Sequence, residues 1–322
     1  MTSFNDLGNF CAYIVKRYGS PGAATEDEKA EEFRKIYLRN LPPNLKILKA
    51  VAATCGVKLS SIDGEKLPEN LRGYHEVYGG TKNIYYRKND TLSGIENTIL
   101  HELREMIEPI FTDVCPDYEP LRTIAVHRAA NSFATAVLLP KADFEKKVYE
   151  TGFDVIALSE IYSKSCSQVL LRMGEVLRGK IFFYAALYEK NENIETDWSV
   201  TYWTGSNNEE NLEANAYGTN GFFPRKGHKV LSDSPVDLTI KTGKTHLFEQ
   251  ITLFDNIDDD SLVAIAQPLQ LSDSKPSKVA LITMLKSDGW KLDPQIERTN
   301  PIVLERLNVS HTGKEFNYEY GT

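Results

Sequence analysis

The residue types best suited to chemistry lie together in one short stretch, His101-Glu102-Leu103-Arg104-Glu105. This H-E-x-x-E pattern differs by one residue from H-E-x-x-H, in which two histidines one helical turn apart bind zinc and the glutamate after the first acts as general base. Glu105 replaces the second histidine, and a carboxylate is also a zinc ligand. On a helix, His101 and Glu105 share one face with their Cβ atoms roughly 6 Å apart. The spacing therefore predicts two ligands of one metal ion, with Glu102 as the base.

A catalytic zinc site needs a third protein ligand, and a common peptidase set is two histidines and one carboxylate. With Glu105 as the carboxylate, we expect the missing ligand to be a histidine, and the chain has six histidines including His101. His127 lies in the next predicted helix, which can run back along the first and face it. Glu108 shares the face of His101 and is the rival third ligand, or a residue that supports the ligands. A lone pattern of this kind also arises by chance on amphipathic helices, and His127 would then be an ordinary packing or surface residue.

Hydrophobic periodicity indicates the elements that must position these residues. Residues 1–40 are predicted to be helical, and the motif helix Leu92–Glu108 is expected to end at Pro109. Further helices are predicted at Leu45–Cys55, Ile124–Leu139, Ala142–Glu150, Asp154–Ile161 and Cys166–Leu177. Two short strands, Tyr74–Val77 and Asn83–Arg87, are predicted between the helix Leu45–Cys55 and the motif helix.

The pattern changes at Lys180, where β-branched and aromatic residues begin to dominate. Strands are predicted at Ile181–Tyr188, Trp198–Thr204, Val236–Lys241, Thr245–Thr252, Leu262–Leu269 and Val279–Leu285. These segments predict a mostly antiparallel sheet. The chain as a whole is therefore expected to be an α+β protein with a helical N-terminal extension (1–40), a mainly helical domain with a small sheet (41–145), a helix-turn-helix-like segment (146–178) and a β-rich domain (179–322).

Composition narrows the function classes. The hydrophobic content of 41% is typical of a soluble globular protein, and no apolar run approaches the length of a membrane span. A net charge of −8 argues against broad, charge-driven binding of nucleic acid. The four cysteines are far apart and residues 1–20 lack the pattern of a signal peptide, so we expect a reducing, cytoplasmic location and no membrane partner.

Residues from about 45 to 178 resemble the ImmA/IrrE family of bacterial zinc metallopeptidases. The resemblance is carried by Leu67–Gly73 (L-P-E-N-L-R-G), by Thr98–Glu102 (T-I-L-H-E) and by Ala130–Pro140 (A-N-S-F-A-T-A-V-L-L-P), in the order that the family shows. The segment from Gly152 to Leu177 is similar to the helical tail of that family. The β-rich part is similar in outline to the GAF-like sensor domain of IrrE.

The resemblance implies a zincin-like metallopeptidase domain with one Zn²⁺ per chain. Carried over position by position, the His-His-Glu ligand set of the family becomes His101, Glu105 and His127, a reciprocal exchange that keeps the number of ligands. A decaying site has no reason to keep that number. The resemblance further implies regulatory proteolysis in a stress or mobile-element response, with a helix-turn-helix repressor as the protein substrate. A small molecule or nucleic acid would act on the C-terminal domain.

Two expectations remain open at this point. On the peptidase hypothesis, the strand residues Ile84, Tyr85 and Tyr86 would lie at a sheet edge that binds an extended substrate, although aromatic packing explains the tyrosines equally well. On the alternative hypothesis, the protein is a catalytically inactive regulator with a peptidase fold that binds DNA or a repressor and senses a ligand. Lys164 and Arg172 are the only basic residues of 154–177, so a structural helix pair is the favoured interpretation of that segment.

Overall fold

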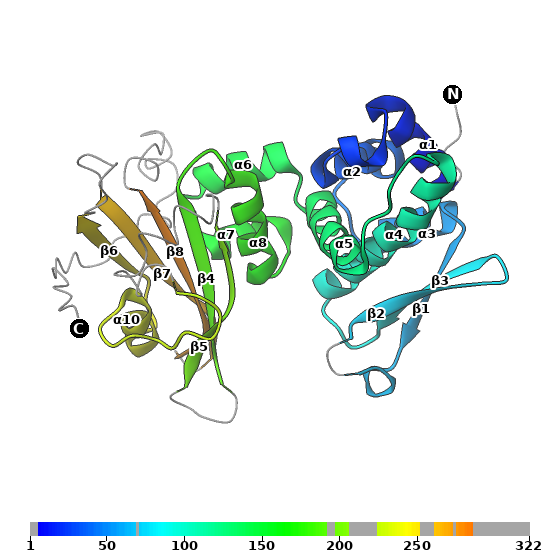
Figure 1. Cartoon of the computed structure of the whole chain (residues 1–322). Coiled ribbons are helices and arrows are strands. Elements are labelled where there is room, and N and C mark those ends of the chain that lie inside the picture. The colour runs from blue at the N-terminus through cyan, green and yellow to red at the C-terminus, as the bar shows by residue number, and fades with distance from the viewer. Residues whose placement is uncertain are drawn as a thin grey trace. The chain divides into compact units, whose positions relative to one another are not determined.

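The computed structural model describes residues 6–68, 71–191, 197–205, 224–251, 261–272 and 275–285. The chain divides into two compact units, residues 1–141 and 142–322 (Figure 1). Each unit combines helices with a sheet, which confirms the predicted α+β class. Residues 286–322, the end of the predicted β-rich domain, lie outside the described residues.

Unit 1 begins with helices and places a small sheet before its two longest helices. The elements are α1 (Leu7–Tyr18), η1 (Pro21–Ala23), α2 (Glu26–Phe33), η2 (Arg34–Leu38), α3 (Leu45–Thr54), β1 (Val57–Ile62), η3 (Gly64–Lys66), β2 (Gly73–Tyr78), β3 (Thr81–Arg87), α4 (Leu92–Val114) and α5 (Thr123–Leu138). Polar side chains start several of the helices: Thr25 caps α2 in a capping box with Glu28, and Thr91 caps α4. These caps satisfy backbone N–H groups that a helix N-terminus leaves without partners.

The three strands of unit 1 are ordered β1-β3-β2, with β3 parallel to β1 and antiparallel to β2. The sequence predicted β2 and β3 but missed β1. The expectation that Ile84, Tyr85 and Tyr86 form a sheet edge is wrong, because β3 is the central strand and is paired on both sides. Among the described strands, β1 and β2 are the edges of this sheet.

Helix α4 continues through Pro109 to Val114, beyond the predicted end at Glu108. A proline inside a helix removes the hydrogen bond to the carbonyl four residues earlier, here that of Glu105. The apolar stripe nevertheless continues past the proline, and Ile107 and Phe111 are both completely buried. Burial of these side chains outweighs the lost backbone bond and keeps the helix intact.

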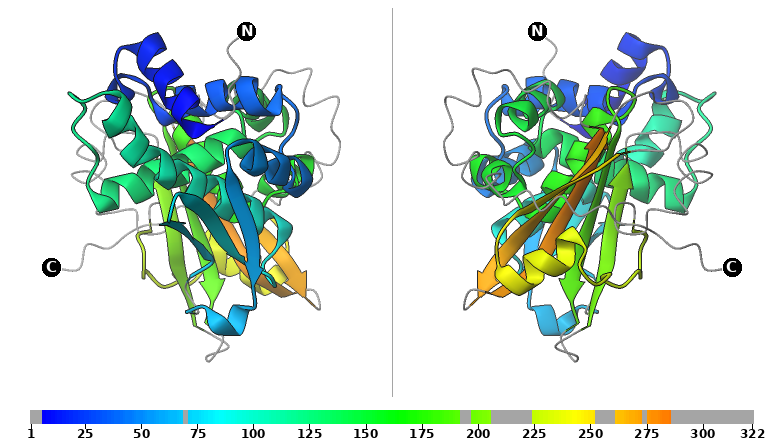
Figure 2. Two further views of the ribbon diagram at one scale, coloured as in Figure 1. Left: turned by 90° about the vertical axis from the view of Figure 1, so that its right-hand side faces the viewer. Right: turned by 90° about the vertical axis from the view of Figure 1, so that its left-hand side faces the viewer.

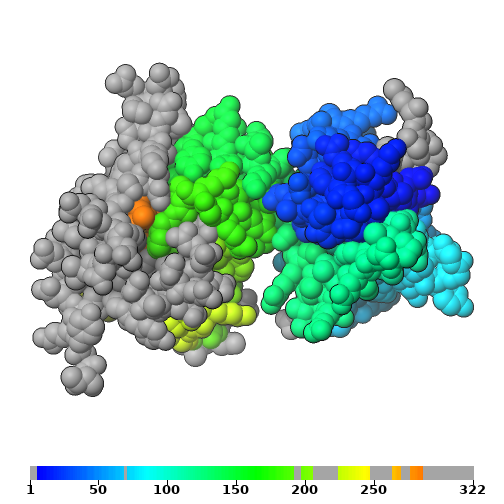
Figure 3. Space-filling view, turned by 45° about the horizontal axis from the view of Figure 1, so that its top comes forward, coloured from blue at the N-terminus to red at the C-terminus, as the bar shows by residue number. Residues whose placement is uncertain are grey.

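The core of unit 1 forms around α4, which contacts α1, α3, α5 and the strands β2 and β3. The N-terminal helices belong to this core, because Phe33 of α2 packs against Phe10 of α1 and against Phe133 of α5, with ring centroids 5.8 and 5.4 Å apart. Figure 3 shows the blue N-terminal helices lying directly against the blue-green part of the chain. Residues 7–38 are therefore an integral part of the unit that carries the motif.

Unit 2 consists of α6 (Lys141–Glu150), α7 (Val155–Tyr162), α8 (Cys166–Leu177), β4 (Phe183–Lys190), β5 (Trp198–Gly205), α10 (Pro235–Thr242), β6 (His246–Ile251), β7 (Ser261–Ser272) and β8 (Lys275–Leu285). The sheet order is β5-β4-β8-β7-β6, and every described pair is antiparallel, as the sequence predicted. Helix α10 packs against β6, β7 and β8 (Figure 2).

The predicted strand Val236–Lys241 is wrong, because these residues form α10. The alternation of apolar and polar residues in V-D-L-T-I-K satisfies a strand, but Ser234 caps the segment and Pro235 occupies its first turn. A serine cap followed by proline is a helix start, and Gly243 ends the helix in the left-handed conformation. The capping residues on either side therefore determine that this segment is a helix, although its apolar and polar residues alternate as in a strand.

The helix pair α7–α8 belongs to the same compact unit as this sheet. The Val155 N–H donates to Gln267 Oε1 at 3.0 Å, and Gln267 Nε2 donates to Asp154 Oδ1 at 2.7 Å. Helix α8 contacts β4 and β5, and Gly174 approaches Thr204 so closely that a Cβ atom would clash with its side chain. The pair is thus packed onto the sheet by specific contacts. No described helix in either unit has the length and apolar character needed to cross a membrane.

Candidate metal centre

Helices α4 and α5 bring together the three residues that the sequence proposed as ligands. His101 Nε2 lies 3.1 Å from Glu105 Oε1, and His127 Nδ1 lies 3.3 Å from the same oxygen. The rings of His101 and His127 meet edge to face, with centroids 4.6 Å apart. The three side chains form a group whose ligand atoms all lie within 4.8 Å of one another and that could hold a metal ion.

The spacing of these donor atoms fits a small cation. Two ligand atoms that each lie about 2.1 Å from a tetrahedral zinc are about 3.4 Å apart. The observed separations of 3.1 and 3.3 Å from Glu105 Oε1 are close to that value. Two imidazole nitrogens and one carboxylate are also a donor set that zinc accepts. The residues present therefore fit a zinc ion.

Asn131 orients the first histidine. Its Oδ1 lies 3.0 Å from His101 Nδ1, and this contact fixes the ring with Nε2 directed at Glu105 Oε1. Metal-binding histidines commonly donate the other ring N–H to a carbonyl or carboxylate, which fixes the ring and the tautomer. Sequence reasoning included Asn131 only as part of a family motif, and missed this contact.

Glu105 is held in its charged form. The hydrogen bond from His101 is the main cause that lowers the pKa of Glu105, and the contacts with His127 and His75 act in the same direction. A carboxylate must be deprotonated to bind a metal, so this environment prepares Glu105 as a ligand.

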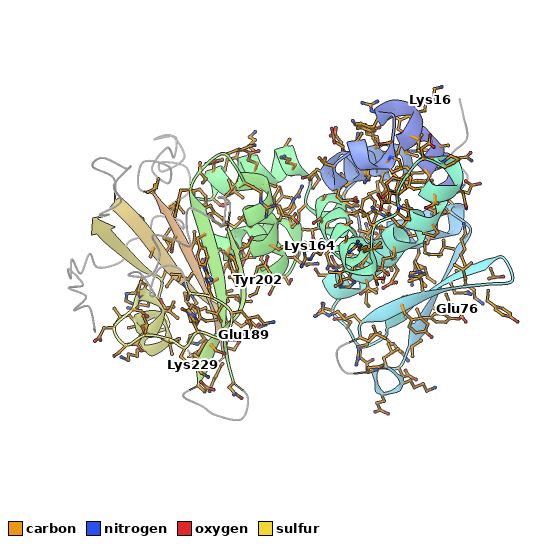
Figure 4. All side chains as sticks on the ribbon, viewed as in Figure 1. Lys16, Glu76, Lys164, Glu189, Tyr202 and Lys229 are labelled. Carbon is orange, nitrogen blue, oxygen red and sulfur yellow. The ribbon has the colours of Figure 1, made fainter. Side chains whose placement is uncertain are left out.

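His75 joins the site from strand β2, although sequence reasoning assigned it no role. Its Nδ1 lies 2.7 Å from Glu102 Oε2 and 3.7 Å from Glu105 Oε2. The hydrogen bond with Glu102 raises the pKa of His75. Figure 4 labels the neighbouring Glu76 on the same strand. The predicted base Glu102 is buried, and His75 holds its carboxylate in place.

Glu108, the rival ligand, lies in a different cluster. Its carboxylate accepts hydrogen bonds from Arg104 Nη1 at 2.9 Å, Tyr118 Oη at 2.7 Å and the Leu121 N–H at 2.9 Å. Burial alone would raise the pKa of Glu108, but these three donors together lower it. Arg104 is completely buried and also donates two hydrogen bonds to Glu26 of α2. Glu108 therefore supports the loop before α5 through Tyr118 and Leu121, and it is no member of the ligand group.

The three residues that were expected to bind substrate at a sheet edge mainly contact other residues of the protein. Ile84 and Tyr86 are buried, and the ring of Tyr85 stacks on that of Tyr74 with centroids 4.8 Å apart. The hydroxyl of Tyr85 lies 3.5 Å from Glu76 Oε2. The neighbouring edge strand β2, which carries His75 on the site, is better placed to pair with an extended segment.

Comparison with known proteins adds information on the fold. No protein-family model matches the sequence, and no curated protein matches it. Among solved structures, the chain is similar to a Mycobacterium tuberculosis transcriptional regulator, with a TM-score of 0.52 and 13% identity over 89% of this chain and 83% of that one. At this identity the likeness shows a shared fold, and it extends over both units.

Proposed function

We propose that the protein is a zinc-dependent endopeptidase of the ImmA/IrrE type. One observation carries the proposal. The imidazoles of His101 and His127 converge on Glu105 at 3.1 and 3.3 Å, while Glu102, next to the first ligand, lies buried beside them. This arrangement supplies the three ligands and the base that zinc-dependent hydrolysis of a peptide bond needs. The reciprocal exchange of Glu105 and His127 retains the usual two histidines and one carboxylate.

The residues of the chain have separate roles in this reaction. Zinc, when bound, supplies a Lewis acid that polarises the scissile carbonyl and makes a water molecule more acidic. Glu102 takes the proton of the attacking water and later passes it to the leaving amine. His75 holds Glu102 Oε2 at 2.7 Å, which fixes the orientation of the carboxylate before substrate binds. Asn131 fixes the ring of His101 in the same way.

Strand β2 offers a way to hold a protein substrate. It is an edge strand among the described strands of its sheet, and it carries His75 into the site. An extended segment that pairs with its free edge would pass beside Glu102 and the ligand group. The exposed side chains of Val77 and Tyr78 on this strand would favour an apolar segment. We propose a helix-turn-helix repressor as the substrate, and cleavage as the step that releases a stress or mobile-element response.

A second candidate function is a regulator with a peptidase fold and no catalytic activity. The similarity to the solved structure of a transcriptional regulator favours it. Binding of DNA through α7 and α8 has little support, because Arg172 is 1% exposed and is paired with Glu175. On this alternative, the protein contacts a repressor protein and senses a ligand through its C-terminal domain, residues 179–322.

Proteolysis in a heterologous bacterial host separates the two functions. Wild-type protein and Glu102→Gln are expressed at equal levels, and new protein N-termini are labelled and identified by mass spectrometry. We expect new N-termini with the wild type, and at least about 10²-fold less cleavage with Glu102→Gln, since glutamine cannot accept the proton. Both proteins should carry equal amounts of tightly bound zinc, because Glu102 is not one of the three residues of the first ligand group. New N-termini that are the same, and equally abundant, with the wild type and with Glu102→Gln would favour the non-catalytic function.

A further inference from the structure

A second group of metal-binding side chains adjoins the first. His75, Glu102 and Glu105 place one ligand atom each within 4.8 Å of one another. Glu105 belongs to both groups, and its two oxygens face different partners. Oε1 lies near His101 and His127, whereas Oε2 faces His75 at 3.7 Å.

The substitution of glutamate for histidine at position 105 gives this geometry a specific consequence. A neutral imidazole has one free nitrogen lone pair and binds one metal ion. A carboxylate has two oxygens and can bind two ions at once, as in two-metal sites whose ions lie about 3.5–4 Å apart. Glutamate at position 105 thus allows a second ion beside the first, whereas histidine at this position would bind only one.

Charge also favours a cation at this place. Glu102 and Glu105 both direct a carboxylate oxygen at His75, with Nδ1 to oxygen distances of 2.7 and 3.7 Å. The nearby guanidinium of Arg104 is engaged elsewhere, by Glu26 and Glu108. Two carboxylates therefore share one imidazole, and Glu102 is 7% exposed, so solvent screens its charge only weakly.

We propose that His75, Glu102 and Glu105 form a second binding site for a divalent cation, with Glu105 bridging it to the first. The proposal rests on the proposed function for its first ion and adds regulation to it. The second ion takes the place of the direct contact between His75 Nδ1 and Glu102 Oε2. It binds more weakly than the first, because two divalent ions at this separation repel each other. Once bound, it occupies the carboxylate that acts as the base, so excess metal inhibits peptide hydrolysis.

Zinc titration of the full chain tests the second site. Protein freed of metal by chelation is equilibrated with rising concentrations of ZnCl₂, and bound zinc is measured by mass spectrometry after rapid removal of free ions. The wild type should bind about one zinc tightly and about one more at higher concentration. His75→Ala should lose the weak zinc and keep the tight one. Glu102→Gln, which keeps the shape of the side chain, should do the same.

Matched variants separate the two sites and control for adventitious binding. His228→Ala, at an exposed histidine of unit 2, should bind zinc as the wild type does. His127→Ala should lose the tight zinc. A wild type with a single zinc that His127→Ala abolishes would overturn the second site and leave the proposed peptidase site standing. Unchanged tight binding in His127→Ala, together with loss in His75→Ala, would overturn the proposed ligand set instead.

Discussion

The position of Glu108 yields a prediction that separates a structural role from metal binding. Glu108→Gln keeps one oxygen that can accept from Tyr118 and Leu121, but it places an amide opposite Arg104 Nη1, now 2.9 Å from the carboxylate. A hydrogen bond to a charged group contributes about 1.5–3 kcal/mol. We therefore expect Glu108→Gln to lower the free energy of unfolding of unit 1 by about 2–3 kcal/mol. Glu108→Ala also removes a partner of a completely buried arginine, and should cost about 3–5 kcal/mol.

Urea denaturation followed by two signals measures this effect. All three tryptophans lie beyond residue 197, so tryptophan fluorescence follows unit 2, whereas far-ultraviolet circular dichroism also follows the helices of unit 1. Glu31→Gln is the matched control, since its side chain is 64% exposed and its ion pair with Lys35 should contribute at most about 0.5 kcal/mol. Zinc content should stay unchanged in all three variants.

The contribution of Glu108 to stability should also depend on pH, in a direction that follows from its lowered pKa. The pKa of Glu108 is lowered in the folded protein from its ordinary value of 4.5. Its contribution to stability is therefore fully present above pH 4.5 and is lost as the pH falls through the lower folded value. The difference between wild type and Glu108→Gln should shrink over that acid range. Normal stability with loss of zinc in Glu108→Gln would refute the reasoning and make Glu108 a ligand.

Three further predictions concern the ligand exchange and the fold. Glu105→His combined with His127→Glu should bind zinc more tightly than at least one of the two single variants, measured by competition with a chelator; a double variant weaker than both singles would refute the exchange. A fragment of residues 142–322 should unfold cooperatively in urea. A shorter fragment that lacks α7 and α8 should not, because these helices pack on the sheet. Cooperative unfolding of the shorter fragment alone would contradict the division into units. Gly73→Ala should lower stability by about 1–3 kcal/mol, because its Cβ would clash with the Tyr85 carbonyl, whereas Gly22→Ala, whose Cβ has ordinary contacts, should change it little; equal thermal midpoints would contradict this packing.

The sequence predicted the parts of the structure that depend on local signals. The helices α1 to α8 could be predicted because each segment carries apolar residues at helical spacing, and a side chain caps the start of most of them. The ligand group could be predicted because His101 and Glu105 are one turn apart on a helix, and because α5 follows α4 after a loop. Pro109 misled the prediction, since a local helix-breaking rule was outweighed by burial of Phe111.

The features that were missed depend on contacts between distant segments. Strand β1 exists because it pairs with β3, more than 20 residues later, and this pairing moves Ile84, Tyr85 and Tyr86 from an edge to the centre of the sheet. His75 reaches Glu102, 27 residues away, only through the pairing of β2 beside α4. No periodicity encodes such register, so neither the partner of the base nor the bridging position of Glu105 could be derived from spacing alone.

Anomalous diffraction at the zinc edge tests the central claim most directly. Crystals of the wild type, grown with one equivalent of zinc, should show a peak about 2.1 Å from His101 Nε2, a Glu105 carboxylate oxygen and a His127 ring nitrogen. Glu102 should lie outside bonding distance of that peak, with Glu108 still bound to Arg104. Absence of a peak at these residues, or a peak bonded to Glu108 in place of His127, would contradict the account.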